Sequence, residues 1–191
     1  ETGITVIALG FFSGDLNPHF FRYPSFYFYL LAIVYGLYVA GRFVAGAAME
    51  DLLVEIAIDP GNFVLLSRGL SALFGTLTIL LVYRLAKRLR DTQTGLAAAL
   101  LMSLCYLHVR ESHFGLLDVT MTFWIILAAE YILRSVRPDS ARTGLIAGIF
   151  SGIATSTNYA GLFLGFSMAG AWLPPRPAPP RSPAIFVEAA R

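Results

Sequence analysis

Long apolar runs separated by short basic loops limit the folds open to this 191-residue chain more than any other feature. A helix that crosses a lipid bilayer needs about 20 mostly apolar residues. Four runs have the length and composition to serve as such spans, although the second is short: residues 71–89, 95–109, 116–134 and 144–173. The last contains Gly, Ser, Thr and Asn, so we expect two helical pieces or one long helix broken near residues 156–158. The sequence therefore predicts an all-α fold, a polytopic transmembrane helix bundle.

Composition supports a membrane-embedded chain over a soluble domain. The chain is 57% hydrophobic and only 14% charged, whereas a soluble domain carries about 25% charged residues. Its net charge of +2 gives no reason to expect a nucleic-acid partner. Cys105 is the only cysteine, which excludes a disulfide framework or a thiolate metal site within one chain.

The segment before these runs is amphipathic rather than uniformly apolar. Residues 25–44 are long enough to span but rich in tyrosine, a residue that favours the membrane–water interface. This segment either crosses the membrane or lies as an interfacial or re-entrant helix. Residues 45–62 predict a short amphipathic helix that ends at the turn signal Asp59-Pro60-Gly61-Asn62. Its apolar face would hold Leu52, Leu53, Ile56 and Ala57, and its acidic face Glu50, Asp51 and Glu55.

These patterns divide the chain into four parts: a first loop (1–24), a helical region before the bundle (25–67), the transmembrane helix bundle (68–173) and a Pro-rich tail (174–191). The tail has no apolar period, and we expect it to be disordered. The chain begins at Glu1 without a methionine or a signal peptide. We therefore expect it to be an N-terminal fragment of a longer membrane protein whose first segment is missing.

Charge predicts the orientation of the bundle. Basic residues collect in the loops at 84–90 and 134–142, and such loops usually face the cytoplasm. The turn at 110–115, between the two intervening helices, would then lie outside.

The stretch HVRESHFGLLD (108–118) carries the densest group of ionisable side chains. Asp118 lies in the first turn of a predicted helix, beyond two leucines. An acid there either complements the helix dipole or has a functional role, since a carboxylate at that depth in the membrane is costly unless it is paired or faces water. His108, Glu111 and His113 are typical of a solvated loop. His108, His113 and Asp118 could approach a metal together, although their spacing matches no strong ligand signature.

The stretch GDLNPHFFRYPSFYFYLLA joins a Pro-stiffened polar loop directly to an apolar helix. Together with SRGLSALFGTLTILLVYRLAKRL, LHVRESHFGLLDVTMTFW and GIATSTNYAG, it resembles the membrane-integral C-type (GT-C) glycosyltransferases over roughly residues 1–170. The most similar branch includes protein O-mannosyltransferases and lipid A aminoarabinose transferases, which use a polyprenyl-phosphate sugar as donor. The resemblance implies that the first loop lies outside and that residues 25–44 are juxtamembrane.

The resemblance also implies a site. Glu1 is similar to the Glu of the family's acidic Asp-Glu pair, and Asp118 to its second acid, so both are expected to be catalytic, Glu1 as part of the general base and Asp118 in orienting the acceptor or binding a metal. The residues expected to bind substrate are Asp15, His19, Arg22, Arg110 and His113. The family often has Lys before Tyr where this chain has Asn158, which puts that lysine's role in doubt. A divalent metal cation is a possible cofactor, as some relatives use one.

The implied function is transfer of a sugar from a polyprenyl-phosphate donor to an acceptor hydroxyl on a lipid, glycan or protein. The protein would be integral to the plasma (inner) membrane, with its site facing outside, and the fragment alone would be inactive. Two alternatives are a non-catalytic transporter or lipid-binding protein that uses the same acids for recognition, and a structural subunit with no site. The enzyme reading requires Glu1 and Asp118 to face one shared outer cavity.

Overall fold

The computed structural model describes residues 1–135 and 141–172, and within them every regular element is a helix. This confirms the predicted all-α fold. The tail at 174–191 lies outside the described residues, as does part of the basic loop predicted at 134–142. In chain order the elements are α1 (Thr2–Gly10), η1 (Phe11–Ser13), α2 (Phe26–Val44), α3 (Met49–Ile58), α4 (Gly61–Leu89), α5 (Thr92–Leu104), α6 (Tyr106–Ser112), α7 (Leu117–Ser135), α8 (Ala141–Thr157), η2 (Tyr159–Leu162) and α9 (Phe163–Trp172).

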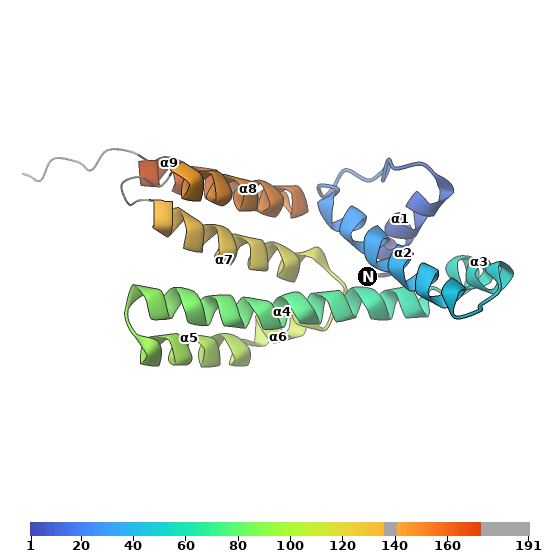
Figure 1. Ribbon diagram of the computed structural model, residues 1–191, viewed down its shortest axis with the longest axis horizontal. Helices are drawn as coiled ribbons and strands as arrows, with labels where there is room; N and C mark the ends of the chain where they lie inside the picture. Colours follow the sequence, from blue (N-terminus) through green and yellow to red (C-terminus); the bar gives the residue numbers. More distant parts are fainter. Residues whose placement is uncertain (136–140, 173–191) are drawn as a thin grey trace, which may run out of the picture.

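Helix α4 forms the axis along which the other helices pack (Figure 1). Helices α5 and α6 lie along one side of it and α7 along the other, while α8 and α9 pack on α7. Helices α1, α2 and α3 gather at the end where α4 begins. The beginnings of α4 and α7 therefore lie towards the N-terminal helices, and their last turns lie at the far end.

Small side chains let the neighbouring helices approach α4 closely. Its buried positions recur every three or four residues, at helical spacing: Phe63, Ser67, Ser71, Gly75, Thr78 and Leu81. A Cβ at Gly75 would collide with the hydroxyl of Ser112 in α6. Close contact between small residues is a common way for membrane helices to associate, since lipid offers no hydrophobic driving force between them.

Two of the described helices, α2 and α4, have the length and composition to cross a membrane, and the pair α5–α6 would add a third span if counted as one. This agrees with a polytopic membrane fold but gives fewer spans than the four runs predicted. Helix α7 is long enough, with 19 residues, but it is not among these spans. It carries three charged residues, Asp118, Glu130 and Arg134. Helix α2 meets the requirement for a span, so its expected juxtamembrane position stays a prediction.

The prediction of one continuous helix at 95–109 is wrong. Helices α5 and α6 meet at a 62° bend, where Cys105 has an extended conformation with ψ 110°. The His108 ring donates a hydrogen bond to the Gly75 carbonyl at 3.1 Å, which holds α6 against α4. No Gly or Pro at the bend signals it in the sequence; the break arises from packing.

The break predicted near residues 156–158 is confirmed. Helix α8 ends at Thr157, and the Asn158 side chain caps η2 by accepting a hydrogen bond from the Ala160 N–H at 3.2 Å. Helix α9 then turns back along α7 and α8. The run therefore forms two helical pieces, the first of the two alternatives, and they are separated at the predicted position.

The N-terminal region differs from its prediction in two places. The expected outer loop begins with α1, whose Thr5, Ala8 and Leu9 are buried. Helix α4 starts at Gly61, inside the predicted turn signal, so only Asp59 and Pro60 separate it from α3.

Helix α3 forms at 49–58, as predicted, but its two faces are not as expected. Leu52 is buried, whereas Leu53 is 57% exposed. Glu55, placed on the solvent face by the sequence pattern, accepts hydrogen bonds from Tyr38 and Asn62 and pairs with Arg42. Glu55 therefore faces the neighbouring helices rather than solvent, because its partners lie on α2 and at the start of α4.

Candidate functional site

Glu1 connects the N-terminus to α4 and to the loop before α7. Its Oε2 accepts a hydrogen bond from Arg68 Nη2 at 2.6 Å, and its Oε1 accepts from Arg68 Nε at 3.1 Å. The backbone N–H of Gly115 also donates to Oε1, at 2.8 Å. The hydrogen bonds and charge of the Arg68 guanidinium hold the pKa of Glu1 below its usual value. Glu1 is therefore an ionised carboxylate with most of its acceptor positions in use.

Asp118 lies in the first turn of α7, just beyond the loop that Glu1 holds. It is exposed, and its Oδ1 accepts a hydrogen bond from Asn158 Nδ2 at 3.3 Å. The carboxylate lines a pocket of about 470 Å³, together with Glu111, His108 and apolar residues of α5 and α7. Asp118 thus has a neutral hydrogen-bond partner and lines a pocket, whereas the Glu1 carboxylate is bound by Arg68 and Gly115.

Tyr27 and Ser71 form a buried polar contact that joins α2 and α4 to the loop before α7. Ser71 Oγ donates to the Leu116 carbonyl at 3.2 Å, so the Tyr27 hydroxyl, 3.5 Å from Ser71 Oγ, donates to Ser71. Leu116 lies between Gly115, which Glu1 binds, and Asp118 in the first turn of α7, so the two carboxylates flank this contact at the beginnings of α4 and α7.

The loop before α2 carries three of the predicted substrate-binding residues. The His19 ring donates to Asp15 Oδ2 at 2.8 Å, and this bond keeps the pKa of Asp15 below its usual value. His19 has a positive φ of 49°, and its N–H is bound by the Asn17 side chain at 3.0 Å. Asp15 and His19 are thus together, on an exposed and tightly turned loop.

Arg22 lies farther along this loop, with its guanidinium 5.8 Å from the centre of the Tyr23 ring. The Tyr159 hydroxyl donates to the neighbouring Phe21 carbonyl at 3.4 Å. Because Tyr159 directly follows Asn158, the partner of Asp118, this contact brings the loop to the same corner as Asp118.

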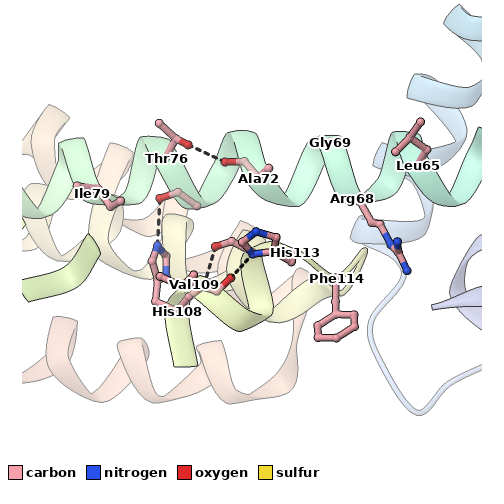
Figure 2. Close-up of a pocket in the computed structure, with 12 residues that line it drawn as sticks. Leu65, Arg68, Gly69, Ala72, Thr76, Ile79, His108, Val109, His113 and Phe114 are labelled. Atoms are coloured by element: carbon pink, nitrogen blue, oxygen red, sulfur yellow. Dashed lines mark hydrogen bonds between the residues drawn. The ribbon is translucent and has the colours of Figure 1, made fainter. Parts of the chain in front are cut away.

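The remaining predicted residues, Arg110 and His113, lie on or beside α6. Arg110 Nε donates to Glu111 at 2.8 Å, so its charge is already matched by its neighbour. His113 donates from Nδ1 to the Val109 carbonyl at 2.7 Å. His113 lines a second pocket, of about 720 Å³, between α4 and α6. Figure 2 shows residues from both helices that line this pocket, including Ala72 and Thr76 of α4 and His108 and Val109 of α6.

The two acids do not share either pocket. Asp118 lines the smaller one, and Glu1 lines neither. Arg68, the partner of Glu1, lines the larger pocket, and His108 lines both. The prediction that both acids face one shared cavity is therefore wrong: Glu1 lies behind Arg68, and two adjoining pockets replace the cavity. The pockets by themselves do not favour an enzyme over a binding protein.

The proposed metal ligands do not converge. Within residues 1–135 and 141–172, no group of three or more His, Cys, Asp or Glu side chains is placed to hold a metal ion. His108 and His113 are engaged with backbone carbonyls, and Asp118 with Asn158. The chain's own residues thus do not form the expected set of ligands, and the divalent cation stays a prediction.

Three residues of this site were not recognised as site residues in the sequence. The sequence assigned no role to Arg68, although it belongs to the stretch SRGL that carries part of the resemblance. Tyr27 lies in the tyrosine-rich segment 25–44 and Ser71 in the apolar run 71–89, and neither pattern singles the residue out. An arginine near the beginning of an apolar helix is a usable signal, because burying it requires a partner acid.

A family model described as dolichyl-phosphate-mannose-protein mannosyltransferase matches residues 45–176. Searches of curated proteins and of solved structures gave no match. The matched region includes Arg68, Ser71, Asp118 and Asn158, and it begins after Glu1 and the loop at 14–25.

Proposed function

The chain belongs to the dolichyl-phosphate-mannose-protein mannosyltransferase family, and from this premise we propose that it moves a sugar from a polyprenyl-phosphate donor to an acceptor hydroxyl at the outer face of a membrane. Membership makes it a mannosyltransferase-like membrane glycosyltransferase. The donor, the acceptor and the sidedness are our proposal.

One observation supports this proposal more than any other: two acids distant in sequence are held at the same end of the helix bundle. Glu1 binds the N–H of Gly115, and Asp118 follows shortly after in α7. A polyprenyl-phosphate sugar keeps its lipid tail in the bilayer and presents its sugar at the surface. Groups at the beginnings of α4 and α7 would meet such a donor where the bilayer ends.

The reaction is a displacement at the anomeric carbon. The acceptor oxygen forms a bond to that carbon, and the bond from the carbon to the phosphate oxygen breaks. The electron pair leaves with the polyprenyl phosphate, and the proton of the acceptor hydroxyl passes to a carboxylate. General-base assistance of this kind contributes roughly 10²- to 10⁴-fold.

Asp118 is the better placed of the two acids to accept the proton. Glu1 uses its oxygens to bind Arg68 and Gly115, and its lowered pKa makes it a weaker base. We therefore assign Glu1 to positioning: it fixes Arg68 and the loop that leads into α7. Asp118 is exposed at a pocket, where an acceptor hydroxyl can reach it.

The departing phosphate needs positive charge. Arginine suits this task because its guanidinium forms paired hydrogen bonds to phosphate. Arg22 is the stronger candidate, since its loop contacts the Asn158–Tyr159 corner, whereas Arg110 is paired with Glu111. Asp15 and His19 would shape the same loop, and His113 would contact substrate from the larger pocket. The acceptor would be a protein, lipid or glycan hydroxyl, and the plasma membrane is the proposed location.

The test replaces Asp118 by Asn or Ala in the intact membrane protein. Both variants should insert normally and lose sugar transfer from a polyprenyl-phosphate donor by about 100-fold or more. Asp51→Asn is the matched control, because Asp51 is an exposed acid on α3, away from this corner. Near-normal transfer by both Asp118 variants would remove Asp118 from the mechanism.

A further inference from the structure

A cluster of basic side chains lies at the other end of the bundle, around a buried acid. We call Arg84, Lys87, Arg88 and Arg134, together with Glu130, the basic cluster. The first three lie in the last turns of α4, and Glu130 and Arg134 lie in the last turns of α7. Asp118 and Arg68 occupy the opposite ends of these two helices, so the basic cluster is separate from the proposed transfer site.

Glu130 is the centre of the cluster. The residue is only 2% exposed, and its Oε1 forms an ion pair and a hydrogen bond with Arg134 one turn later. Arg84 Nη2 and Arg88 Nη1 approach the same oxygen at 3.6 and 3.8 Å. These two distances fit ion pairs but are longer than hydrogen bonds. One carboxylate therefore orients three guanidinium groups but accepts a hydrogen bond only from Arg134, so most N–H groups of Arg84 and Arg88 are not bound by Glu130.

Among the residues that the structure describes, positive charge and hydrogen-bond donors are in excess here. Four basic side chains line the same pocket as one carboxylate, and each guanidinium carries five N–H donors. These side chains line a pocket of about 500 Å³ that also includes Tyr83. The Arg84 and Arg88 side chains are 52% and 37% exposed, so an anion can reach them.

The position of the cluster indicates which anion it meets. Helix α4 has the length and composition of a span, and the cluster lies in its last turns. The end of a span lies at the level of the lipid headgroups. Basic pockets between membrane helices at that level attract anionic headgroups.

We propose that the basic cluster binds the phosphate of an anionic phospholipid headgroup. Glu130 prearranges Arg84, Arg88 and Arg134, and the lipid phosphate takes the donors that Glu130 leaves free. This site is distinct from donor binding and requires no sugar.

The test measures phospholipid binding to the purified chain in detergent micelles by native mass spectrometry. The probes are palmitoyl-oleoyl phosphatidylglycerol, which is anionic, and the matching phosphatidylcholine, which is zwitterionic. The unaltered protein should bind the anionic lipid at least about tenfold more tightly, and Arg84→Gln with Arg88→Gln should remove most of this preference. An equal concentration of soluble glycerol 3-phosphate should not displace the lipid.

Arg90→Gln is the matched control for Arg88→Gln. It removes the same charge at the same helix end, but Arg90 is 79% exposed and pairs with Asp91 instead of Glu130. We expect it to leave binding unchanged, and we expect Arg88→Lys to retain most of it. Three results would each overturn the proposal: equal binding of both lipids by the unaltered protein, equal losses from Arg88→Gln and Arg90→Gln, or displacement by glycerol 3-phosphate.

Discussion

Glu1 and Asp118 are both carboxylates, yet their neighbours give them different chemistry. Glu1 accepts hydrogen bonds from a guanidinium and a backbone amide, which stabilises its charged form and weakens it as a base. Asp118 has Asn158 as a neutral partner and a pocket beside it. The resemblance implied a catalytic role for both acids, because the sequence carries no information on which of them meets Arg68.

Replacing Glu1 by Gln should therefore reduce stability more than it changes chemistry directly. Glutamine can still accept a bond from Gly115 but leaves Arg68 without its counter-charge. Because the Arg68 side chain is 47% exposed, we expect a loss of only about 1 kcal/mol. The melting temperature in detergent should fall by about 2–4 °C. Glu50→Gln, at an exposed acid of α3, should leave it unchanged.

The same contact predicts a dependence on pH. The folded pKa of Glu1 lies below its unfolded value, so its stabilising contribution is complete above the unfolded pKa and is lost as the pH falls through the folded pKa. Melting curves of the unaltered protein and Glu1→Gln should thus differ at neutral pH and converge in acid. A difference that persists unchanged well below the carboxyl range would show that Glu1 does not act through its charge.

At the scale of the helices, 3-10 helix η2 positions the neighbour of Asp118. A Cβ at Gly161 would lie 2.5 Å from the backbone of Ala154 and Thr155 in α8. Gly161→Ala should therefore push η2 away from α8 and destabilise the protein by about 1–3 kcal/mol. It should also weaken sugar transfer, because Asn158 begins this turn.

Gly152→Ala is the control for this prediction. Gly152 lies within α8 with open space around its Cα, so alanine should be neutral or slightly stabilising. Thermal melts and transfer assays of both variants give the comparison. Equal stability of the two variants would contradict the close packing of η2 on α8.

The elements differ in how far the sequence reveals them. Helices α4 and α7 could be predicted because their apolar runs are long, and the break at Asn158 because polar residues interrupt one. The bend at Cys105 could not be predicted, since it depends on His108 reaching Gly75 across helices. Helix α1 was missed because its short apolar run is stabilised by burial of Thr5, Ala8 and Leu9 rather than by a local pattern.

The candidate site was predictable in its residue types but not in its connections. Asp118 and the loop at 14–25 could be named from resemblance. Their meeting point depends on Tyr159 contacting Phe21 and on Asn158 contacting Asp118. Both are contacts between distant segments, which a single sequence does not show.

At the scale of the whole molecule, the bundle has an acidic end and a basic end. Glu1 and Asp118 lie near the beginnings of α4 and α7, and the basic cluster lies near their ends. Basic residues favour the cytoplasmic side, which places the acidic end outside in the proposed orientation.

Cysteine labelling tests this orientation. In a Cys105→Ala background, Phe114→Cys should react with a membrane-impermeant maleimide from outside intact cells. Gln93→Cys should react only after permeabilisation, because it lies in the first turn of α5, which follows directly after the basic end of α4. Both positions are exposed, so accessibility within the fold does not limit either. Labelling of both from the same side would contradict the predicted orientation.

The most direct measurement for the account as a whole follows both products of one reaction. The intact protein is incubated with an acceptor and a polyprenyl-phosphate mannose labelled in both the sugar and the lipid. We predict that free polyprenyl phosphate appears in proportion to the sugar gained by the acceptor, and that Asp118→Asn yields neither product while still binding the donor. Donor that stays bound and intact with the unaltered protein would contradict sugar transfer and identify a binding protein instead.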